Sequence, residues 1–208
     1  MHEAHVVTEF VGQRKRVAIG VLAGAVVAIA EDRQAVLGIL ADAGAAVARY
    51  IADATAPLDL GVQRADVLGF SDGGVVGLGL AIRYPALVRK LIAAGANYNM
   101  DGLYPEVVEF LKTAGPDDFG QLRDAYIRIA PRPEDWPTLV SKAMKMGYGF
   151  KGWPKDAVRS IKAPVLIVIG DRDMVRPEHA VELFRLLPNA SLAVLPNTDH
   201  VALVKAPD

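Results

Sequence analysis

The sequence predicts an α/β fold, with a mainly parallel sheet flanked by helices, on three observations. A chain of 208 residues suffices for one domain with a substantial core. Amphipathic or glycine-spaced helical patterns follow several short apolar runs, which is typical of strand–helix units. The runs end in glycine, proline or aspartate, as strands do before turns. The predicted strands are Ala65–Phe70, Val88–Ala94, Val165–Ile169 and Ser191–Leu195.

The first of these runs leads into a serine placed between two glycines, Gly69 and Gly73, in the pattern G-x-S-x-G. A helical pattern follows from Val75 to Tyr84. A serine on a sharp strand-to-helix turn projects its hydroxyl clear of the backbone, and only glycine fits where strand and helix pass closely. The pattern therefore predicts a nucleophile at Ser71, and the alternative is a chance match beside an ordinary turn.

Composition excludes several classes of function. The net charge is −1 and the longest basic run is Arg14-Lys15-Arg16, which argues against nucleic acid as a partner. The chain has no cysteine, so disulfides, thiolate catalysis and cysteine metal sites are excluded. No apolar run reaches the roughly 18 residues that a membrane-spanning helix needs, so we expect no membrane association.

The apolar run Val17–Ala30 has two interpretations. With its basic flank and its Ala28-Ile29-Ala30 ending, the stretch 14–30 has the pattern of a secretory signal. The acidic residues Glu3 and Glu9 before it favour a buried strand or helix instead. We therefore expect a cytoplasmic protein, with export as the alternative, and we predict a helix over Glu31–Asp53.

Between Asn97 and Ile161 the chain carries both tryptophans and most of its aromatic residues, and it shows no strand pattern. Amphipathic helices are predicted around Leu122–Ile129 and Leu139–Met146, the second with Asp135 as its N-cap. These features indicate an all-helical insertion. Its aromatic and methionine side chains either line an apolar pocket or form a small core of their own.

The last part of the chain returns to strands and helices. The continuous apolar run Val165–Ile169 predicts a strand buried on both faces, and it ends in Gly170-Asp171-Arg172-Asp173. A helix is predicted over Pro177–Leu187, with Val181, Phe184 and Leu187 on its apolar stripe. The strand Ser191–Leu195 is followed by Asp199 and His200.

In such sheets the functional residues usually lie at the carboxyl ends of the strands. Three of the predicted strands are followed by suitable groups: Ser71, the pair Asp171 and Asp173, and His200. A serine hydroxyl needs a histidine to take its proton and a carboxylate to orient that histidine. The other histidines, His2, His5 and His179, are predicted to lie on the surface.

With these motifs, residues from about 50 to 208 resemble a bacterial α/β-hydrolase of the serine esterase and C–C hydrolase type. The resemblance rests on the elbow Leu68–Gly74, the acid strand Val165–Asp173 and the histidine turn Leu195–His200. It implies a single domain over 1–208, with 97–161 as a helical cap. It also implies Ser71 as nucleophile, His200 as base and a mechanism without cofactor or metal. The family's acid lies three positions after the glycine, which selects Asp173, with Asp171 as fallback; Asp199 is too close to the histidine.

The resemblance further implies that the backbone N–H of Asp72 donates to the oxyanion. A second donor should come from a loop after an earlier strand, but none is recognisable, and Gly20, Gly24 and Gly38 are the nearest glycines. Residues 1–50 are expected to be divergent or truncated relative to the family, and the C-terminus to stop before its final helix. A sheet edge exposed in this way could support a homo-oligomer.

The resulting expectation is a serine hydrolase that acts on an ester or related carbonyl of a small molecule with an apolar acyl or aromatic group. C–C bond hydrolysis, acyl transfer and cofactor-free haloperoxidase or perhydrolase chemistry would use the same triad. The alternative is a catalytically impaired relative, a binding protein or a fragment, which lacks a complete oxyanion hole.

Overall fold

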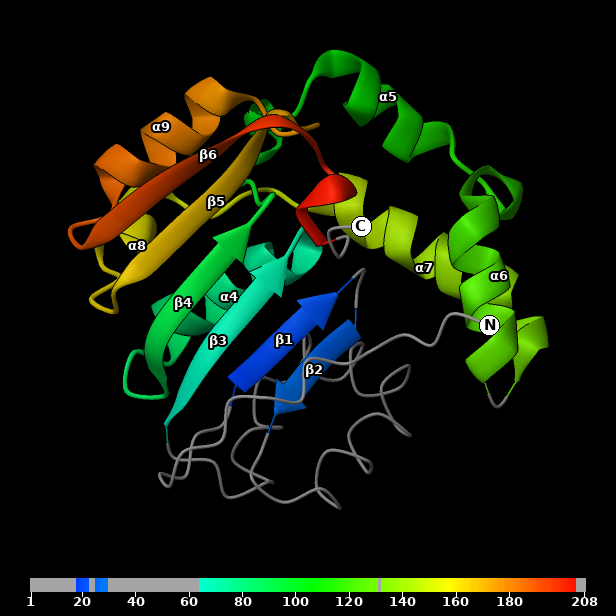
Figure 1. Cartoon of the computed structure of the whole chain (residues 1–208), viewed down its shortest axis with the longest axis horizontal. Helices are drawn as coiled ribbons and strands as arrows, with labels where there is room; N and C mark the ends of the chain where they lie inside the picture. Colours follow the sequence, from blue (N-terminus) through cyan, green and yellow to red (C-terminus); the bar gives the residue numbers. More distant parts are fainter. Residues whose placement is uncertain (1–17, 23–24, 30–63, 131, 205–208) are drawn as a thin grey trace.

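The computed structural model describes residues 18–22, 25–29, 64–130 and 132–204. These residues form a six-stranded sheet with the strand order β2-β1-β3-β4-β5-β6 (Figure 1). Neighbouring strands are parallel except β1 and β2, which are antiparallel, so the predicted mainly parallel sheet is confirmed. The strands are β1 Ala18–Leu22, β2 Ala25–Ile29, β3 Ala65–Phe70, β4 Val88–Ala94, β5 Val165–Arg172 and β6 Ala190–Asp199.

The apolar run Val17–Ala30 thus supplies two strands of the sheet. β1 pairs in parallel with β3, and Val21 lies opposite Gly69, so the carboxyl end of β1 lies beside the strand that leads to Ser71. β2 returns antiparallel along the outer side of β1 (Figure 1). The predicted helix over Glu31–Asp53 lies outside the described residues.

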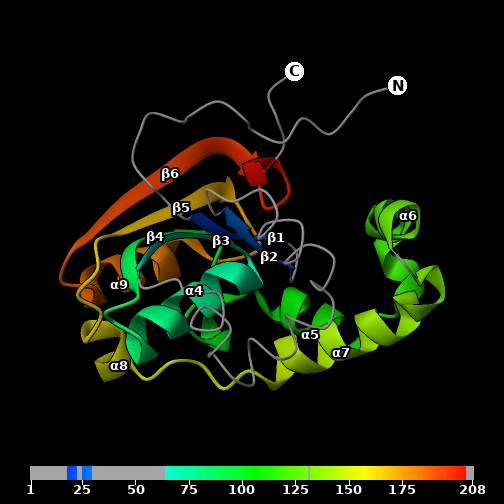
Figure 2. The ribbon, with the colours of Figure 1, turned by 90° about the horizontal axis from the view of Figure 1, so that it is seen from below.

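Three helices cover one face of the sheet: α4 Asp72–Arg83, α8 Lys155–Arg159 and α9 Pro177–Leu186 (Figure 2). The core lies between these helices and the inward side chains of β3, β4 and β5. The largest fully buried core residues include Val67, Leu91, Ile167, Leu78, Ile161 and Leu183.

The prediction that Val165–Ile169 is buried on both faces is wrong. Val165, Ile167 and Ile169 are at most 2% exposed, whereas Leu166 is 36% exposed. Successive side chains of a strand point to opposite faces, and the described helices α4, α8 and α9 all lie on one of them. Leu68 and Leu166 both lie opposite Ile92 in the sheet register, and Leu68 is also exposed.

The segment predicted as a helical insertion is helical. It contains α5 Pro105–Thr113, α6 Gly120–Ile129 and α7 Trp136–Gly149, together with short 3-10 helices at Met100–Gly102 (η1), Pro116–Phe119 (η2) and Pro133–Asp135 (η3). Figures 1 and 2 place α6 farthest from the sheet, at the outer end of α7. The segment leaves the sheet after β4, close to the strand ends that carry the candidate site.

Two details of this segment differ from the prediction. Val158 and Ile161 belong to the main core and are fully buried, so the part from α8 onward packs with the sheet layer rather than with the insertion. Asp135 precedes α7, but its side chain makes no capping hydrogen bond. Its carboxylate instead lies 2.7 Å from the guanidinium of Arg132.

Within the described part of the chain, no helix combines the length and the apolar character needed to cross a bilayer.

Candidate active site

The turn after β3 has the backbone geometry of a nucleophile elbow. Ser71 has φ 56° and ψ −127°, a left-handed conformation that is strained for a residue with a side chain. Its N–H donates to the carbonyl of Ala94 on β4 at 2.8 Å, which ties the turn to the neighbouring strand. A Cβ on Gly69 would lie 2.2 Å from the carbonyl oxygen of Gly73, so strand and helix pass too closely for any side chain there.

The structure brings the three predicted side chains together. His200 Nε2 lies 2.9 Å from Ser71 Oγ, and His200 Nδ1 lies 2.7 Å from Asp173 Oδ1. The carboxylate of Asp173 is completely buried, and the imidazole of His200 is 11% exposed. An ionised carboxylate only accepts hydrogen bonds, so this arrangement favours the tautomer with the proton on Nδ1. Nε2 then faces the serine hydroxyl as an acceptor.

Asp173 is held by the turn in which it lies. Its Oδ1 also accepts the N–H of Val175 at 3.1 Å, whereas Oδ2 is buried without a hydrogen-bond partner among the described residues. The fallback residue, Asp171, is exposed, and its Oδ1 accepts the N–H of Thr198 at 3.1 Å. Hydrogen bonds from the backbone of Asn197 and Thr198 lower the pKa of Asp171. Asp171 therefore holds the last residues of β6, and Asp173 contacts the imidazole.

Two further residues pack against the imidazole, and the sequence patterns did not single them out. The ring of Phe70 lies 4.7 Å from that of His200, between centroids. Gly95, directly after β4, has φ +55°, and a Cβ there would lie 3.0 Å from the His200 ring. Phe70 ends β3 before the predicted nucleophile, and Gly95 directly follows the neighbouring strand β4, so position at a strand end was the available signal. Together they limit the rotation of the imidazole.

Asp72 begins α4 directly after Ser71, so its backbone N–H lies at the N-terminus of a helix, where donors are free to meet an anion. Its own carboxyl is half-buried, and burial raises its pKa, while the proximity of His200 lowers it by less. Of the glycines considered for the second donor, Gly20 lies inside β1 opposite Leu68. Gly24 and Gly38 lie outside the described residues.

A cavity of about 450 Å³ opens beside the candidate triad. It is lined by residues from the turns after β5 and β6 and from the start of the insertion: Tyr104, Glu106, Val107, Arg172, Asp173, Met174, Asp199, His200 and Val201. Of the insertion's aromatic residues, Tyr104 reaches this cavity. Trp136 instead packs against Tyr126 and donates its indole N–H to the carbonyl of Pro116, so it belongs to the insertion's own packing. One aromatic residue of the insertion thus lines the cavity, next to several charged residues, while Trp136 belongs to the insertion's own packing.

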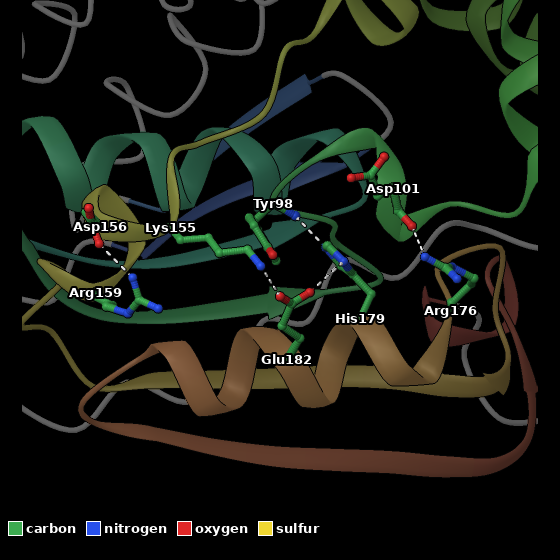
Figure 3. A network of polar contacts seen from close by, with 8 residues as sticks. All are labelled: Tyr98, Asp101, Lys155, Asp156, Arg159, Arg176, His179 and Glu182. Atoms are coloured by element: carbon green, nitrogen blue, oxygen red, sulfur yellow. Dashed lines mark hydrogen bonds and ion pairs between the residues drawn. The ribbon is translucent and has the colours of Figure 1, made fainter.

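The prediction that His179 lies on the surface is wrong. The residue is 3% exposed and stacks on the ring of Tyr98, with centroids 4.4 Å apart (Figure 3). The buried side of α9 consists of His179, Ala180, Leu183 and the following Leu187, whereas Phe184 of the predicted stripe is 38% exposed. His2 and His5 lie outside the described residues. Within the described part of the chain, no group of three or more His, Asp or Glu side chains is arranged to hold a metal ion.

A parallel sheet with a strained serine turn, an acid turn and a histidine turn at the carboxyl ends of its strands defines a class of hydrolase folds. The sequence model of the alpha/beta hydrolase family matches residues 22–208, and the chain belongs to this family. The match begins well before residue 50, so the family likeness extends further toward the N-terminus than the sequence motifs indicated.

Curated relatives agree with this assignment. The chain is 24% identical over 144 residues to a mouse protein named serine hydrolase BPHL, covering 66% of this chain and 49% of the relative. It is 27% identical over 182 residues to the 2-hydroxymuconate semialdehyde hydrolase of Pseudomonas putida, covering 77% and 64%. The chain therefore spans about half of the first relative and less than two thirds of the second.

Solved structures show the same fold. A bacterial membrane phospholipase A matches with a TM-score of 0.59 and 24% identity, over 79% of this chain and 59% of that one. The meta-cleavage product hydrolase CumD of Pseudomonas fluorescens matches with a TM-score of 0.53 and 16% identity, over 77% and 66%. At these identities the likeness establishes the fold alone.

Proposed function

We propose that this protein is a serine hydrolase that cleaves an ester or related carbonyl compound through an acyl-enzyme. Ser71 Oγ attacks the carbonyl carbon while His200 Nε2 takes its proton. Asp173 stabilises the imidazolium that forms, and the N–H of Asp72 donates to the oxyanion. His200 returns the proton to the leaving group, and water then repeats the sequence to release the acyl group.

One observation carries this proposal: His200 lies within hydrogen-bond distance of both Ser71 Oγ, at 2.9 Å, and Asp173 Oδ1, at 2.7 Å. These residues lie 129 and 27 positions from the histidine in the chain, so the fold has to assemble them. The strained φ of Ser71 adds support, because backbone strain of this kind persists where the surrounding structure enforces it.

We propose a small-molecule substrate with an apolar or aromatic acyl group, because Tyr104, Val107 and Met174 line the cavity beside the triad. Two relatives bear names that suggest variants of the same chemistry, 2-hydroxymuconate semialdehyde hydrolase and a putative carbamate hydrolase. Hydrolysis of a C–C bond or of a carbamate would use the same nucleophile, base and acid. We take α5, α6 and α7, the helices of the segment predicted as a cap over 97–161 that precede α8, as a cap beside this cavity.

We propose the cytoplasm as the location. Residues 18–22 and 25–29 form β1 and β2, so removal of the stretch 14–30 as a secretory signal would delete two strands from the sheet. β1 is also the direct neighbour of β3, the strand that leads to the nucleophile.

A second candidate function is a catalytically impaired relative that binds a ligand without turnover. It is favoured by the oxyanion site, where Asp72 supplies one N–H and a second donor is not identified among the described residues. Loss of one such donor lowers turnover by about 10²- to 10³-fold.

Labelling with a fluorophosphonate distinguishes the two candidates. The intact mass of the parent protein should increase by one phosphonyl group, and Ser71→Ala should remain unlabelled. Ser141→Ala is the matched control, because this serine is exposed on α7 and should leave the labelling unchanged. A folded parent that takes no label contradicts the hydrolase proposal and favours the binding function. Label on Ser71→Ala would show that another residue reacts.

A further inference from the structure

His179 is a buried, polar residue to which the proposed mechanism assigns no role. It lies in the first half of α9, and its Nε2 accepts the backbone N–H of Tyr98 at 3.1 Å (Figure 3). The imidazole also stacks on the Tyr98 ring, with an interplanar angle of 13°. A Cβ on Gly102 would lie 2.5 Å from the His179 ring, so η1 closes the site from another side. His179 therefore holds the chain after β4 by both a hydrogen bond and a ring stack.

The hydrogen bond from Tyr98 requires a neutral imidazole with a free lone pair on Nε2. Burial lowers the pKa of His179 to about 4, which keeps the ring neutral at physiological pH. Four charged groups act on it: Asp101 on η1, Lys155 on α8, Arg176 before α9 and Glu182 on α9. Glu182 lies 3.9 Å from His179 Nδ1 and is engaged by Lys155 Nζ at 2.6 Å.

The segment that His179 holds contacts the candidate triad at its beginning. Ala94 accepts the N–H of Ser71, and Gly95 packs against the His200 ring. Gly95 N–H also donates to the carbonyl of Val168 on β5 at 2.8 Å. Tyr98 follows three residues after Gly95, so a shift at Tyr98 reaches the imidazole of His200 through a short, bonded stretch of backbone.

The same segment contacts the acid turn at its other end. The N–H of Arg176 donates to the carbonyl of Gly102 at 2.8 Å, and Leu103 forms an isolated β-bridge with Val175. Val175 in turn donates its N–H to Asp173 Oδ1. The stretch from Gly95 to Leu103 thus joins the His200 ring to the carboxylate that orients it, and His179 holds it near the middle.

We propose that His179 is a positioning residue: through Tyr98 it holds the segment after β4 against the acid turn, and so keeps Asp173 and His200 aligned with Ser71. It touches neither the reacting atoms nor the cavity beside them. Its effect is on the geometry of the proton-transfer groups, so its loss should lower kcat more than it changes KM. This inference rests on the proposed hydrolase function for its kinetic part.

Two amide substitutions of different reach test the proposal. The carbonyl oxygen of His179→Gln can occupy the position of Nε2 and accept from Tyr98, whereas His179→Asn is one carbon too short. His179→Phe keeps the ring stack and removes the acceptor. With a short-chain 4-nitrophenyl ester, we expect kcat of the Gln variant within about threefold of the parent. We expect a loss of about 10- to 100-fold in kcat for Asn and Phe, with KM changed much less.

A second readout does not depend on turnover. The proton between His200 Nδ1 and Asp173 should give a strongly downfield ¹H resonance, which His200→Gln identifies by its loss. It should persist in His179→Gln and be lost or broadened in the folded Asn and Phe variants. If the parent hydrolyses no ester and takes no fluorophosphonate, the proposed function fails alone, and this resonance decides the positioning role.

The proposal is overturned if folded Asn or Phe variants keep both the parental kcat and the resonance. It is equally overturned if His179→Gln folds but loses the resonance. If the Asn and Phe variants fail to fold, the Gln variant alone decides. It supports the proposal if it keeps both the parental kcat and the resonance, because its amide oxygen then replaces Nε2 as the acceptor.

Discussion

Replacement of Asp173 by asparagine tests the proposed acid most directly, because the structure limits what an amide can do there. The carboxylate accepts two donors on one oxygen, Oδ1: His200 Nδ1 at 2.7 Å and the N–H of Val175 at 3.1 Å. The other oxygen, Oδ2, is buried without a partner among the described residues. An asparagine can be placed in two orientations, and both leave a donor unpaired.

If the amide oxygen of Asp173→Asn takes the place of Oδ1, both bonds persist, but the NH₂ group is buried where no acceptor is found. If the NH₂ group faces His200 instead, Val175 loses its acceptor, and Nδ1 must become the acceptor. The proton of His200 then moves to Nε2, which can no longer take the serine proton. An unpaired buried donor costs about 1–3 kcal/mol, so the free energy of unfolding should fall by about this amount in the second orientation, where Val175 N–H loses its acceptor. In the first orientation an unpaired NH₂ replaces the oxygen Oδ2, which is already unpaired in the parent, so the loss should be smaller.

We therefore expect Asp173→Asn to fold, with a melting temperature lowered by about 2–4 °C for each kcal/mol lost. Where the second orientation prevails, ester hydrolysis should fall by about 10⁴-fold. Asp171→Asn is the matched control, since this exposed carboxylate accepts backbone N–H groups near the end of β6, among them that of Thr198, and the change should alter turnover by less than about threefold. Initial rates with a 4-nitrophenyl ester and thermal unfolding measure both. If Asp173→Asn retains turnover while Asp171→Asn loses it, the assignment of the acid is wrong.

Three further predictions concern the elbow and its supports. Gly69→Ala should abolish fluorophosphonate labelling or folding, because its Cβ would lie 2.2 Å from the Gly73 carbonyl oxygen. The control Gly147→Ala, in open space on α7, should raise the free energy of unfolding by about 0.5–1 kcal/mol. A folded Gly69→Ala that takes the label would refute the tight elbow. Asp72→Asn should raise the melting temperature at neutral pH but not near pH 3, because a carboxyl with a raised pKa destabilises the fold as it ionises; an unchanged melting temperature at neutral pH argues against this. Trp153→Phe should cost about 1 kcal/mol in urea unfolding, since the indole N–H donates to the Val75 carbonyl at 3.0 Å; no loss would show that this bond is dispensable.

Local patterns sufficed for the residues of the candidate site. Ser71 is marked by its flanking glycines, Asp173 by its distance from Gly170, and His200 by its place after the last strand. Each of these signals arises from the turn in which the residue lies, so it can be recognised without knowing what the turn packs against. The distances among the three side chains depend on the strand order β3-β4-β5-β6, which the alternation of strands and helices only restricts.

Burial was predicted less well, because it depends on partners distant in the sequence. Leu166 belongs to a continuous apolar run in the sequence, but it is exposed because the helices α4, α8 and α9 lie on the other face of the sheet. For the same reason the sequence did not indicate the residues that pack against His200. Gly95 is not part of any motif, and its contact with the imidazole arises from the fold.

His179 shows how a single polar residue can shift the interpretation of a helix. His179 was assigned to the surface as a polar residue within a helix, and the apolar stripe was predicted through Val181, Phe184 and Leu187. The buried side instead runs through His179, Leu183 and Leu187, at the regular spacing of four. This spacing is present in the sequence, but it was not recognised because histidine is seldom counted among the core residues of a helix. The hydrogen-bond partner of His179 is a backbone N–H, which any residue at position 98 except proline would offer. The identity of residue 98 therefore could not predict this bond. A buried histidine on an apolar stripe near a predicted acid turn is therefore worth testing as a support of that turn before it is assigned to solvent.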